Sequence, residues 1–165
     1  MIFDVQTILK AEGKRVPVQL NLLPPETFSN QEIQFSDDAS FSGELENIGG
    51  VLELSGQVSG TFLVPCARCT KMTKQQYIIS VSETYAHENA EVTDRDEVIP
   101  FSGTEIDLDD AIWPTVFSEL SVKYLCKPDC KGLCPKCGAD LNEVTCSCTD
   151  DEIDPRLAGL ADLLK

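Results

Sequence analysis

Apolar and polar residues alternate strictly over several stretches of the chain, and this period of two predicts β-strands. The clearest run begins at Ala39 and puts Phe41, Gly43 and Leu45 on one face. A turn at residues 47–50 leads into a longer run, whose apolar face holds Leu52, Leu54, Gly56, Val58, Gly60, Phe62 and Val64. Two such runs joined by a short turn predict a pair of antiparallel strands.

Two weaker alternating runs, at residues 16–22 and 77–85, extend this pattern to an antiparallel β-meander. Residues 23–31, which begin with a Leu-Pro-Pro sequence, are expected to form a loop. Within the long run, Gly56 and Gly60 are expected to bend or bulge the strand, because an interior glycine weakens a regular ladder.

Two further segments predict helices. Residues 1–14 fit a short helix with Asp4 as its N-cap and Gly13 near its C-terminal end. Residues 107–120 fit a second helix with Asp107 as its N-cap, because apolar residues recur there every four positions. Those apolar residues are Leu108, Ile112, Val116 and Leu120.

Pro114 lies inside the second predicted helix and lacks the backbone N–H that an interior position uses. We therefore expect a kink at this position, or a helix that restarts at Pro114. The flanking Trp113 and Phe117 are assigned to the core, since large aromatic side chains beside an apolar stripe are usually buried.

The last segment of the chain predicts an amphipathic helix. Asp154 and Pro155 are typical of a helix start, and Leu157, Leu160 and Leu164 follow as an apolar stripe. A helix of about three turns is marginal by itself in water. It is therefore expected to dock on its own domain or on a partner.

The charge of the 165-residue chain is strongly negative. Its 13 Lys and Arg oppose 28 Asp and Glu, which gives a formal charge of -15 and a sequence pI near 4.3. The acidic residues are spread along the chain, and this charge disfavours direct binding to RNA phosphates. A basic protein is the expected partner, and no small-molecule substrate is indicated.

The N-terminal segment lacks the features of a secretion signal, because Asp4 and Lys10 interrupt what would be its apolar region. No apolar run is long enough to span a membrane. We therefore expect a cytoplasmic protein. In that reducing compartment, eight cysteines are better explained by metal binding than by disulfides.

Six of the cysteines lie within residues 126–148 at metal-ligand spacings. The segment Cys134-Pro-Lys-Cys137-Gly138 has the pattern of a zinc knuckle, in which one tight turn directs two thiolates at one ion. Cys146 and Cys148 are two residues apart, so they project to the same side of an extended segment. The four cysteines 134, 137, 146 and 148 form one predicted zinc site.

The remaining cysteines are Cys66, Cys69, Cys126 and Cys130. The first pair falls at a predicted hairpin tip and the second directly follows the predicted helix, so all four are candidates for a second zinc site. Such a site would clamp the cysteine-rich segment to the meander. Two other groupings stay open: the second pair could join the Cys134 knuckle, or a single ion could leave several thiols free.

A site with four cysteine ligands leaves no open position for water, so its expected role is structural rather than catalytic. We expect two zinc ions; an iron–sulfur cluster and a thiol redox centre are the alternatives. His87 is the only histidine and reads as the solvated end of a strand. No phosphate-binding loop or serine nucleophile motif is found, and the chain is not expected to be an enzyme.

These patterns predict an α+β fold with an antiparallel β-meander core, a few short helices and a C-terminal zinc-knuckle region. Residues 1–125 form the β-rich core with one helix near 107–120. Residues 126–150 form the cysteine-rich zinc-binding segment, and residues 151–165 form the amphipathic helix. The three parts are expected to fold as one unit.

Three motifs occur in order along the chain: Pro65-Cys-Ala-Arg-Cys-Thr70, the segment from Cys130 through the Cys134 knuckle to Asn142, and the terminal segment 154–164. Together they resemble the large ribosomal RNA subunit accumulation protein family, also called the YceD family. The resemblance implies a bacterial cytoplasmic protein needed for normal levels of large-subunit ribosomal RNA, with no catalytic residues. The sequence departs from the family pattern at Pro114 and at residues 121–123, where a proline is common.

From the resemblance and the charge together, we expect a non-enzymatic accessory factor in ribosome biogenesis. It would act through a protein partner, such as a basic ribosomal protein or an rRNA-processing enzyme. The alternatives are a zinc-stabilised protein-interaction module unrelated to ribosomes, and a thiol redox or iron–sulfur protein.

Overall fold

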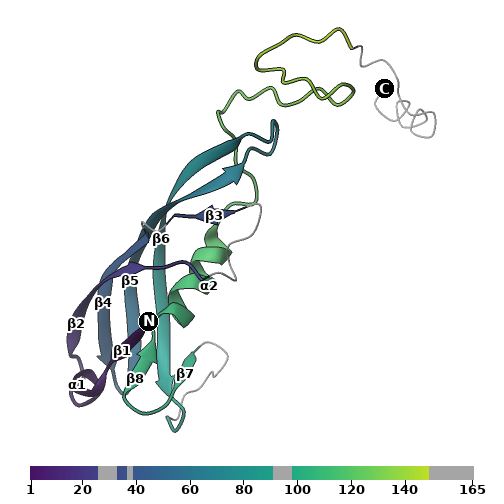
Figure 1. Cartoon of the computed structure of the whole chain (residues 1–165). Coiled ribbons are helices and arrows are strands. Elements are labelled where there is room, and N and C mark those ends of the chain that lie inside the picture. Colours follow the sequence, from purple (N-terminus) through teal and green to yellow (C-terminus); the bar gives the residue numbers. More distant parts are fainter. Residues whose placement is uncertain (26–32, 37–38, 91–97, 149–165) are drawn as a thin grey trace, which may run out of the picture.

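The computed structural model describes residues 1–25, 33–36, 39–90 and 98–148. A mixed six-stranded sheet runs in the order β2-β4-β5-β6-β7, with β3 paired to β5, and a separate two-stranded sheet joins β1 and β8 (Figure 1). The mainly β architecture with two short helices agrees with the expected fold class. The elements are β1 Ile2–Asp4, α1 Gln6–Leu9, β2 Arg15–Leu22, β3 Gln34–Phe35, β4 Ala39–Ile48, β5 Val51–Pro65, β6 Met72–His87, β7 Ile99–Phe101, β8 Glu105–Asp107 and α2 Asp109–Glu119.

The centre of the large sheet is formed by β4, β5 and β6, which pair antiparallel with their neighbours in sequence. Along β5 the inward face carries the apolar residues that the alternation predicts, and Leu52, Leu54, Val58 and Phe62 are fully buried. The matching face of β6 buries Tyr77, Ile79, Val81 and Tyr85. One-sided burial therefore explains the period of two in the sequence.

The expected bulge at Gly56 and Gly60 is wrong, because the pairing of β5 with β6 continues through both positions without an inserted residue. The glycines instead make room for aromatic rings. A Cβ at Gly56 would lie 2.6 Å from the Phe41 ring, and one at Gly60 would lie 2.6 Å from the Tyr77 hydroxyl.

Helix α2 lies along one face of the large sheet and closes the core (Figure 1). Its Trp113 is completely buried, and the indole packs edge-on against Phe35 with ring centroids 5.7 Å apart. Phe117 is half-buried and lies 6.3 Å from the same ring. Trp113 is thus a core residue, as predicted, whereas Phe117 is only half-buried.

The first predicted helix is much shorter than residues 1–14. Ile2–Asp4 forms strand β1, which pairs with β8, and only Gln6–Leu9 is helical. Val5, rather than Asp4, occupies the N-cap position, although the Asp4 carboxylate accepts a hydrogen bond from the Gln6 N–H at 2.8 Å. Strand pairing has replaced the first turn of the expected helix.

The second predicted helix begins two residues later than expected, because Asp107 is the last residue of β8. Its carboxylate still accepts a hydrogen bond from the Asp109 N–H at 3.0 Å. The helix runs on through Pro114 to Glu119 and does not restart there. Packing of its buried face outweighs the single backbone hydrogen bond that a proline removes.

Two short strands have no signal in the sequence pattern. Gln34–Phe35 pairs antiparallel with β5, and Ile99–Phe101 pairs parallel with the end of β6. The parallel pair makes the sheet mixed rather than wholly antiparallel. His87 ends β6 and is half-buried, with its ring edge-on to Phe101 at 5.3 Å.

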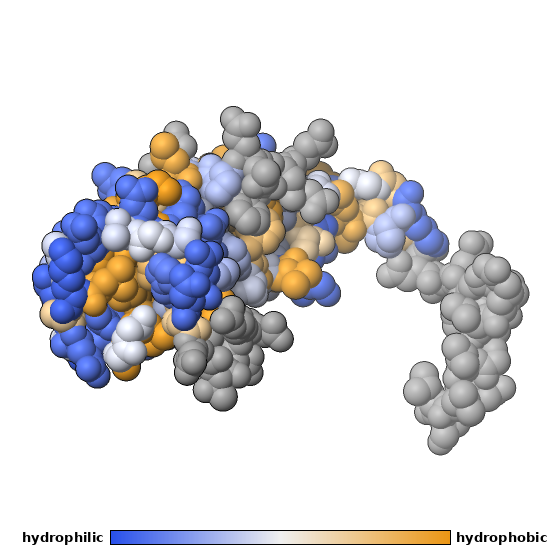
Figure 2. Space-filling model, turned by 90° about the horizontal axis from the view of Figure 1, so that it is seen from below, coloured by the Kyte–Doolittle hydropathy of each residue, from blue (hydrophilic) through white to orange (hydrophobic). Residues whose placement is uncertain are grey.

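Beyond the sheet, the tip of the β5–β6 hairpin and the segment after α2 come together as a projection, here called the extension (residues 65–74 and 121–148) (Figures 1 and 2). The Ala67 N–H donates to the Tyr124 carbonyl at 2.8 Å, and the Leu133 N–H donates to the Arg68 carbonyl at 3.0 Å. These bonds join segments that are far apart in the sequence.

The predicted terminal helix, residues 151–165, lies outside the described residues, as does most of the predicted loop at 23–31. Among the helices that the structure does describe, none has the length and apolar character needed to cross a membrane.

Candidate metal centres

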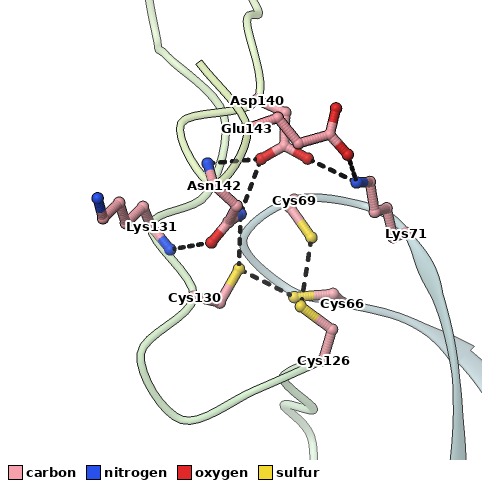
Figure 3. Close-up of polar contacts among 9 residues, drawn as sticks. All are labelled: Cys66, Cys69, Lys71, Cys126, Cys130, Lys131, Asp140, Asn142 and Glu143. Atoms are coloured by element: carbon pink, nitrogen blue, oxygen red, sulfur yellow. Dashed lines mark hydrogen bonds and ion pairs between the residues drawn. The ribbon is translucent and has the colours of Figure 1, made fainter. Parts of the chain in front are cut away.

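The Cys66 pair sits in a tight turn at the tip of the β5–β6 hairpin. The Cys66 N–H donates to the Lys71 carbonyl at 2.9 Å, and the Thr70 N–H donates to the Cys66 carbonyl at 2.9 Å. Thr70 closes the turn with a φ of 58°, a left-handed conformation that is uncommon for a β-branched residue. The turn directs the thiols of Cys66 and Cys69 toward one point (Figure 3).

The Cys134 pair is held by the same two hydrogen bonds. The Cys134 N–H donates to the Ala139 carbonyl at 2.8 Å, and the Gly138 N–H donates to the Cys134 carbonyl at 2.9 Å. Gly138 has a φ of 73°. The chain therefore contains two equivalent knuckles, and the sequence pattern identified only the one with glycine at the left-handed position.

Each knuckle is completed by a second pair of cysteines. One cluster contains Cys66, Cys69, Cys126 and Cys130, and the other contains Cys134, Cys137, Cys146 and Cys148. Within each cluster all four sulfur atoms lie within 4.8 Å of one another. Of the groupings that the sequence left open, the structure shows the one with two separate groups, and it does not bring the Cys126 pair into one cluster with the Cys134 knuckle.

Sulfur–sulfur distances in the first cluster suit a single tetrahedral ion. The Cys66 and Cys130 sulfur atoms lie 3.8 Å apart, and those of Cys69 and Cys126 lie 3.6 Å apart. Four sulfurs bonded to zinc at about 2.3 Å stand about 3.8 Å from one another at the corners of a tetrahedron. The four side chains therefore need little movement to bind a metal.

The two clusters differ in exposure to solvent. In the first, Cys66, Cys69 and Cys130 are at most 2% exposed, and they form a small hydrophobic cluster of their own with Leu125 and Leu133 packed against it. In the second, only Cys134 is buried, while cysteines 137 and 148 are exposed. The first cluster is therefore mostly buried, and the second lies at the surface.

Backbone N–H groups prepare one thiol of each knuckle for metal binding. The N–H of Cys126 lowers the pKa of Cys66 to about 6, and the N–H of Cys137 lowers the pKa of Cys134 to about 6. Burial has the opposite effect on Cys126 and raises its pKa to about 12. Since the thiolate is the metal-binding form, these lowered pKa values favour metal binding at Cys66 and Cys134.

Asn142 connects the two clusters. It lies between the two cysteine pairs of the second cluster in sequence, yet its Nδ2 donates to the Cys130 sulfur of the first cluster at 3.4 Å (Figure 3). Its Oδ1 accepts from the Lys131 N–H at 2.9 Å. Burial opposes ionisation of Cys130, but the hydrogen bonds from Asn142 and the Gly132 backbone outweigh it and lower the pKa of that thiol.

Ion pairs fasten the same loop to the first knuckle. The Lys71 ammonium lies 2.9 Å from an Asp140 carboxylate oxygen and also contacts Glu143 (Figure 3). The Asn142 N–H and Lys71 together lower the pKa of Asp140 to about 2. The loop of the second cluster is therefore part of the wall of the first.

These contacts predict a selective effect of Asn142→Ala. Loss of a hydrogen bond to a metal-binding sulfur typically weakens metal binding by about 10- to 100-fold, and we expect that range for the first cluster only. Competition with a chromophoric zinc chelator measures the affinity of each site. Glu143→Gln, which removes only an exposed ion pair, is the matched control. Equal affinities for Asn142→Ala and the control would contradict this role of Asn142.

A comparison with known protein families decides what the chain is. The family model for the large ribosomal RNA subunit accumulation protein YceD matches residues 54–164, a span that includes all eight cysteines. The chain belongs to the YceD family. The resemblance noted in the sequence is thereby confirmed.

Relatives of the family occur in bacteria and in plant chloroplasts. An uncharacterised Mycobacterium tuberculosis protein is 32% identical over 123 residues, which is 73% of this chain and 59% of that protein. The YlbN protein of Bacillus subtilis is 22% identical over 161 residues, covering 89% of this chain and 94% of that protein. The chloroplastic YCED homolog 1 of Arabidopsis thaliana is 39% identical over 59 residues, 36% of this chain and 18% of that protein.

The chain thus spans about 59% of the length of the Mycobacterium tuberculosis protein that it matches. No solved structure matches it.

Several features of this site had no clear signal in the sequence. The first knuckle has Thr70 at the left-handed position, where the usual sequence pattern has glycine. The role of Asn142 is visible only in the fold, which places it beside Cys130.

Proposed function

We propose that the chain is a non-enzymatic accessory factor in the accumulation of large-subunit ribosomal RNA, and so in ribosome biogenesis. Membership of the YceD family carries this proposal. The names of the plant relatives point the same way, since they refer to accumulation of the same RNA. The bacterial relatives add no further assignment.

Two zinc ions with a structural role are part of the proposal. The short distances between sulfur atoms favour one tetrahedral ion per cluster over an iron–sulfur cluster, whose thiolates bind different irons and lie farther apart. Zinc would supply a crosslink between segments far apart in sequence. With four sulfur ligands at each ion, no coordination position is left for a substrate or a catalytic water.

The partner that we propose is a basic protein of the large subunit or of its processing machinery. The support is electrostatic, because the chain carries 28 acidic against 13 basic residues. Complementary charge accelerates association and selects against acidic partners. The net negative charge of the chain therefore favours contact with a basic protein.

Depletion in the native host tests the proposed function. We expect the ratio of large-subunit to small-subunit ribosomal RNA to fall, and a plasmid copy of the wild-type chain to restore it. Affinity purification of the tagged chain, with RNA and protein both identified, tests the partner. A normal RNA ratio and normal subunit profiles after depletion would refute the role in ribosome biogenesis.

A further inference from the structure

Basic residues are concentrated in the extension, although the whole chain is acidic. The extension contains seven of the 13 Lys and Arg but only three of the 28 Asp and Glu. Its formal charge is therefore +4 before metal binding, while the remaining residues carry -19. The net charge of the chain is the sum of two regions whose charges have opposite sign.

The basic residues of the extension come from two separate parts of the sequence, which backbone hydrogen bonds hold side by side. Lys74 follows the first knuckle, whereas Lys123, Lys127 and Lys131 lie on the segment after α2. All four side chains are exposed, and none of the four forms an ion pair within the described residues. Their ammonium groups are available to a ligand.

Metal binding reduces the charge of the extension but leaves this contrast in place. Each zinc ion with four thiolates contributes about -2, so the extension would be close to neutral overall. The sulfurs of the first cluster are mostly buried, however, while the lysine ammonium groups are at the surface. An approaching polyanion would meet exposed cations on the extension, whereas the rest of the chain, with a formal charge of -19, would repel it on average.

An apolar hollow lies where the extension joins the sheet. It has a volume of about 460 Å³, within the range of small-ligand pockets, and Pro65, Val122 and Tyr124 line it together with Val64 and Thr70. Single-stranded nucleic acids combine phosphate contacts to basic side chains with bases placed on apolar or aromatic surface. A paired helix would not offer a free base to such a hollow.

We infer that the extension is a binding surface for single-stranded RNA, with exposed lysines on the phosphates and the hollow receiving an unstacked base. The inference rests on the proposed function only for the source of the RNA, a large-subunit transcript. It assigns the two kinds of partner to separate regions. The acidic body remains available to a basic protein while the extension holds RNA.

A binding experiment on the zinc-loaded full chain tests this surface. The probe is a fluorescent 12-nucleotide single-stranded RNA of mixed sequence, titrated at several salt concentrations. The test variant is Lys123→Gln with Lys127→Gln and Lys131→Gln. The control combines Lys10→Gln, Lys14→Gln and Arg15→Gln, which changes the net charge equally at the other end of the molecule.

We expect the extension variant to bind about tenfold or more weakly, with a salt slope reduced by about 2, because each lost phosphate contact removes about 0.7. The control variant should bind within about twofold of the wild type. Zinc content and melting temperature verify that both variants are folded. Equal RNA affinity of the two variants, or a wild-type chain without salt-dependent RNA binding, would overturn the inference.

Two further outcomes distinguish a failure of this inference from a failure of the proposed function. If purified basic ribosomal proteins bind through the three lysines and RNA does not, the extension is a protein surface and the inference fails. If RNA binds in vitro as expected but depletion leaves ribosomal RNA levels unchanged, the surface is correct and the proposed function fails.

Discussion

Substitution of Cys66 by serine is expected to reduce the zinc content of the purified chain from about two ions to about one. Cys66 is 1% exposed, and its sulfur lies 3.8 Å from that of Cys130. Serine cannot replace the thiolate, so the first cluster should lose its ion and the extension its attachment to the hairpin. Elemental analysis measures the stoichiometry, and hydrogen exchange should show loss of protection in residues 126–148.

The sheet should stay folded in this variant. Its core, centred on Trp113 and the inward faces of β4, β5 and β6, is separate from the small cluster around the cysteines. Ala67→Ser is the matched control, because it places a hydroxyl in the same turn at an exposed position that is not a ligand. Retention of two zinc ions by Cys66→Ser, or a wild-type chain with fewer than two, would refute the two-site arrangement.

Replacement of Gly43 by alanine is expected to destabilise the sheet by about 3 kcal/mol, at the upper end of typical overpacking effects. Gly43 faces Gly56 across β4 and β5. A Cβ at Gly43 would lie 2.2 Å from the Ser55 carbonyl oxygen and 2.7 Å from the Phe41 ring. Since one of these neighbours is backbone, the strands themselves would have to separate.

Thermal unfolding measures this effect, and a loss of about 3 kcal/mol corresponds to a melting temperature lower by about 6–12 °C for a chain of this size. Ser42→Ala, an exposed change one position away, should alter stability by no more than about 0.5 kcal/mol. If Gly43→Ala and Ser42→Ala had the same melting temperature, the close packing of the glycine pair would be disproved.

The long strands were predictable because one of their faces is buried along the whole length. Burial forces residues such as Leu54 and Val81 onto one side, and this leaves a period of two in the sequence. The strands of two or three residues leave no such record. Strand β7, for example, exists because it pairs with the end of β6, a contact set by the tertiary structure.

The Cys134 group was predictable from spacing, and the Cys66 group was one of several groupings that the sequence left open. The residues around both groups were not predictable. A hydrogen bond from Asn142 to the Cys130 sulfur depends on how two loops pack, and no periodicity encodes that. The total charge also gave no sign of the basic extension, because the larger negative charge of the remaining residues dominates the sum. The whole-chain expectation against RNA contact therefore applies to the body and not to the extension.

The position of the first knuckle at the tip of the β5–β6 hairpin links the first cysteine cluster to the register of the two strands. Fifteen residue pairs, from Val51 opposite Ala86 to Pro65 opposite Met72, set the position of the turn that holds Cys66 and Cys69. Their partner Cys126 arrives 57 residues after Cys69. A slip of one residue would turn every side chain to the other face and misplace the thiols. The four sulfur atoms can therefore meet only when the hairpin is correctly aligned, so a bound metal would stabilise the native register over a shifted one.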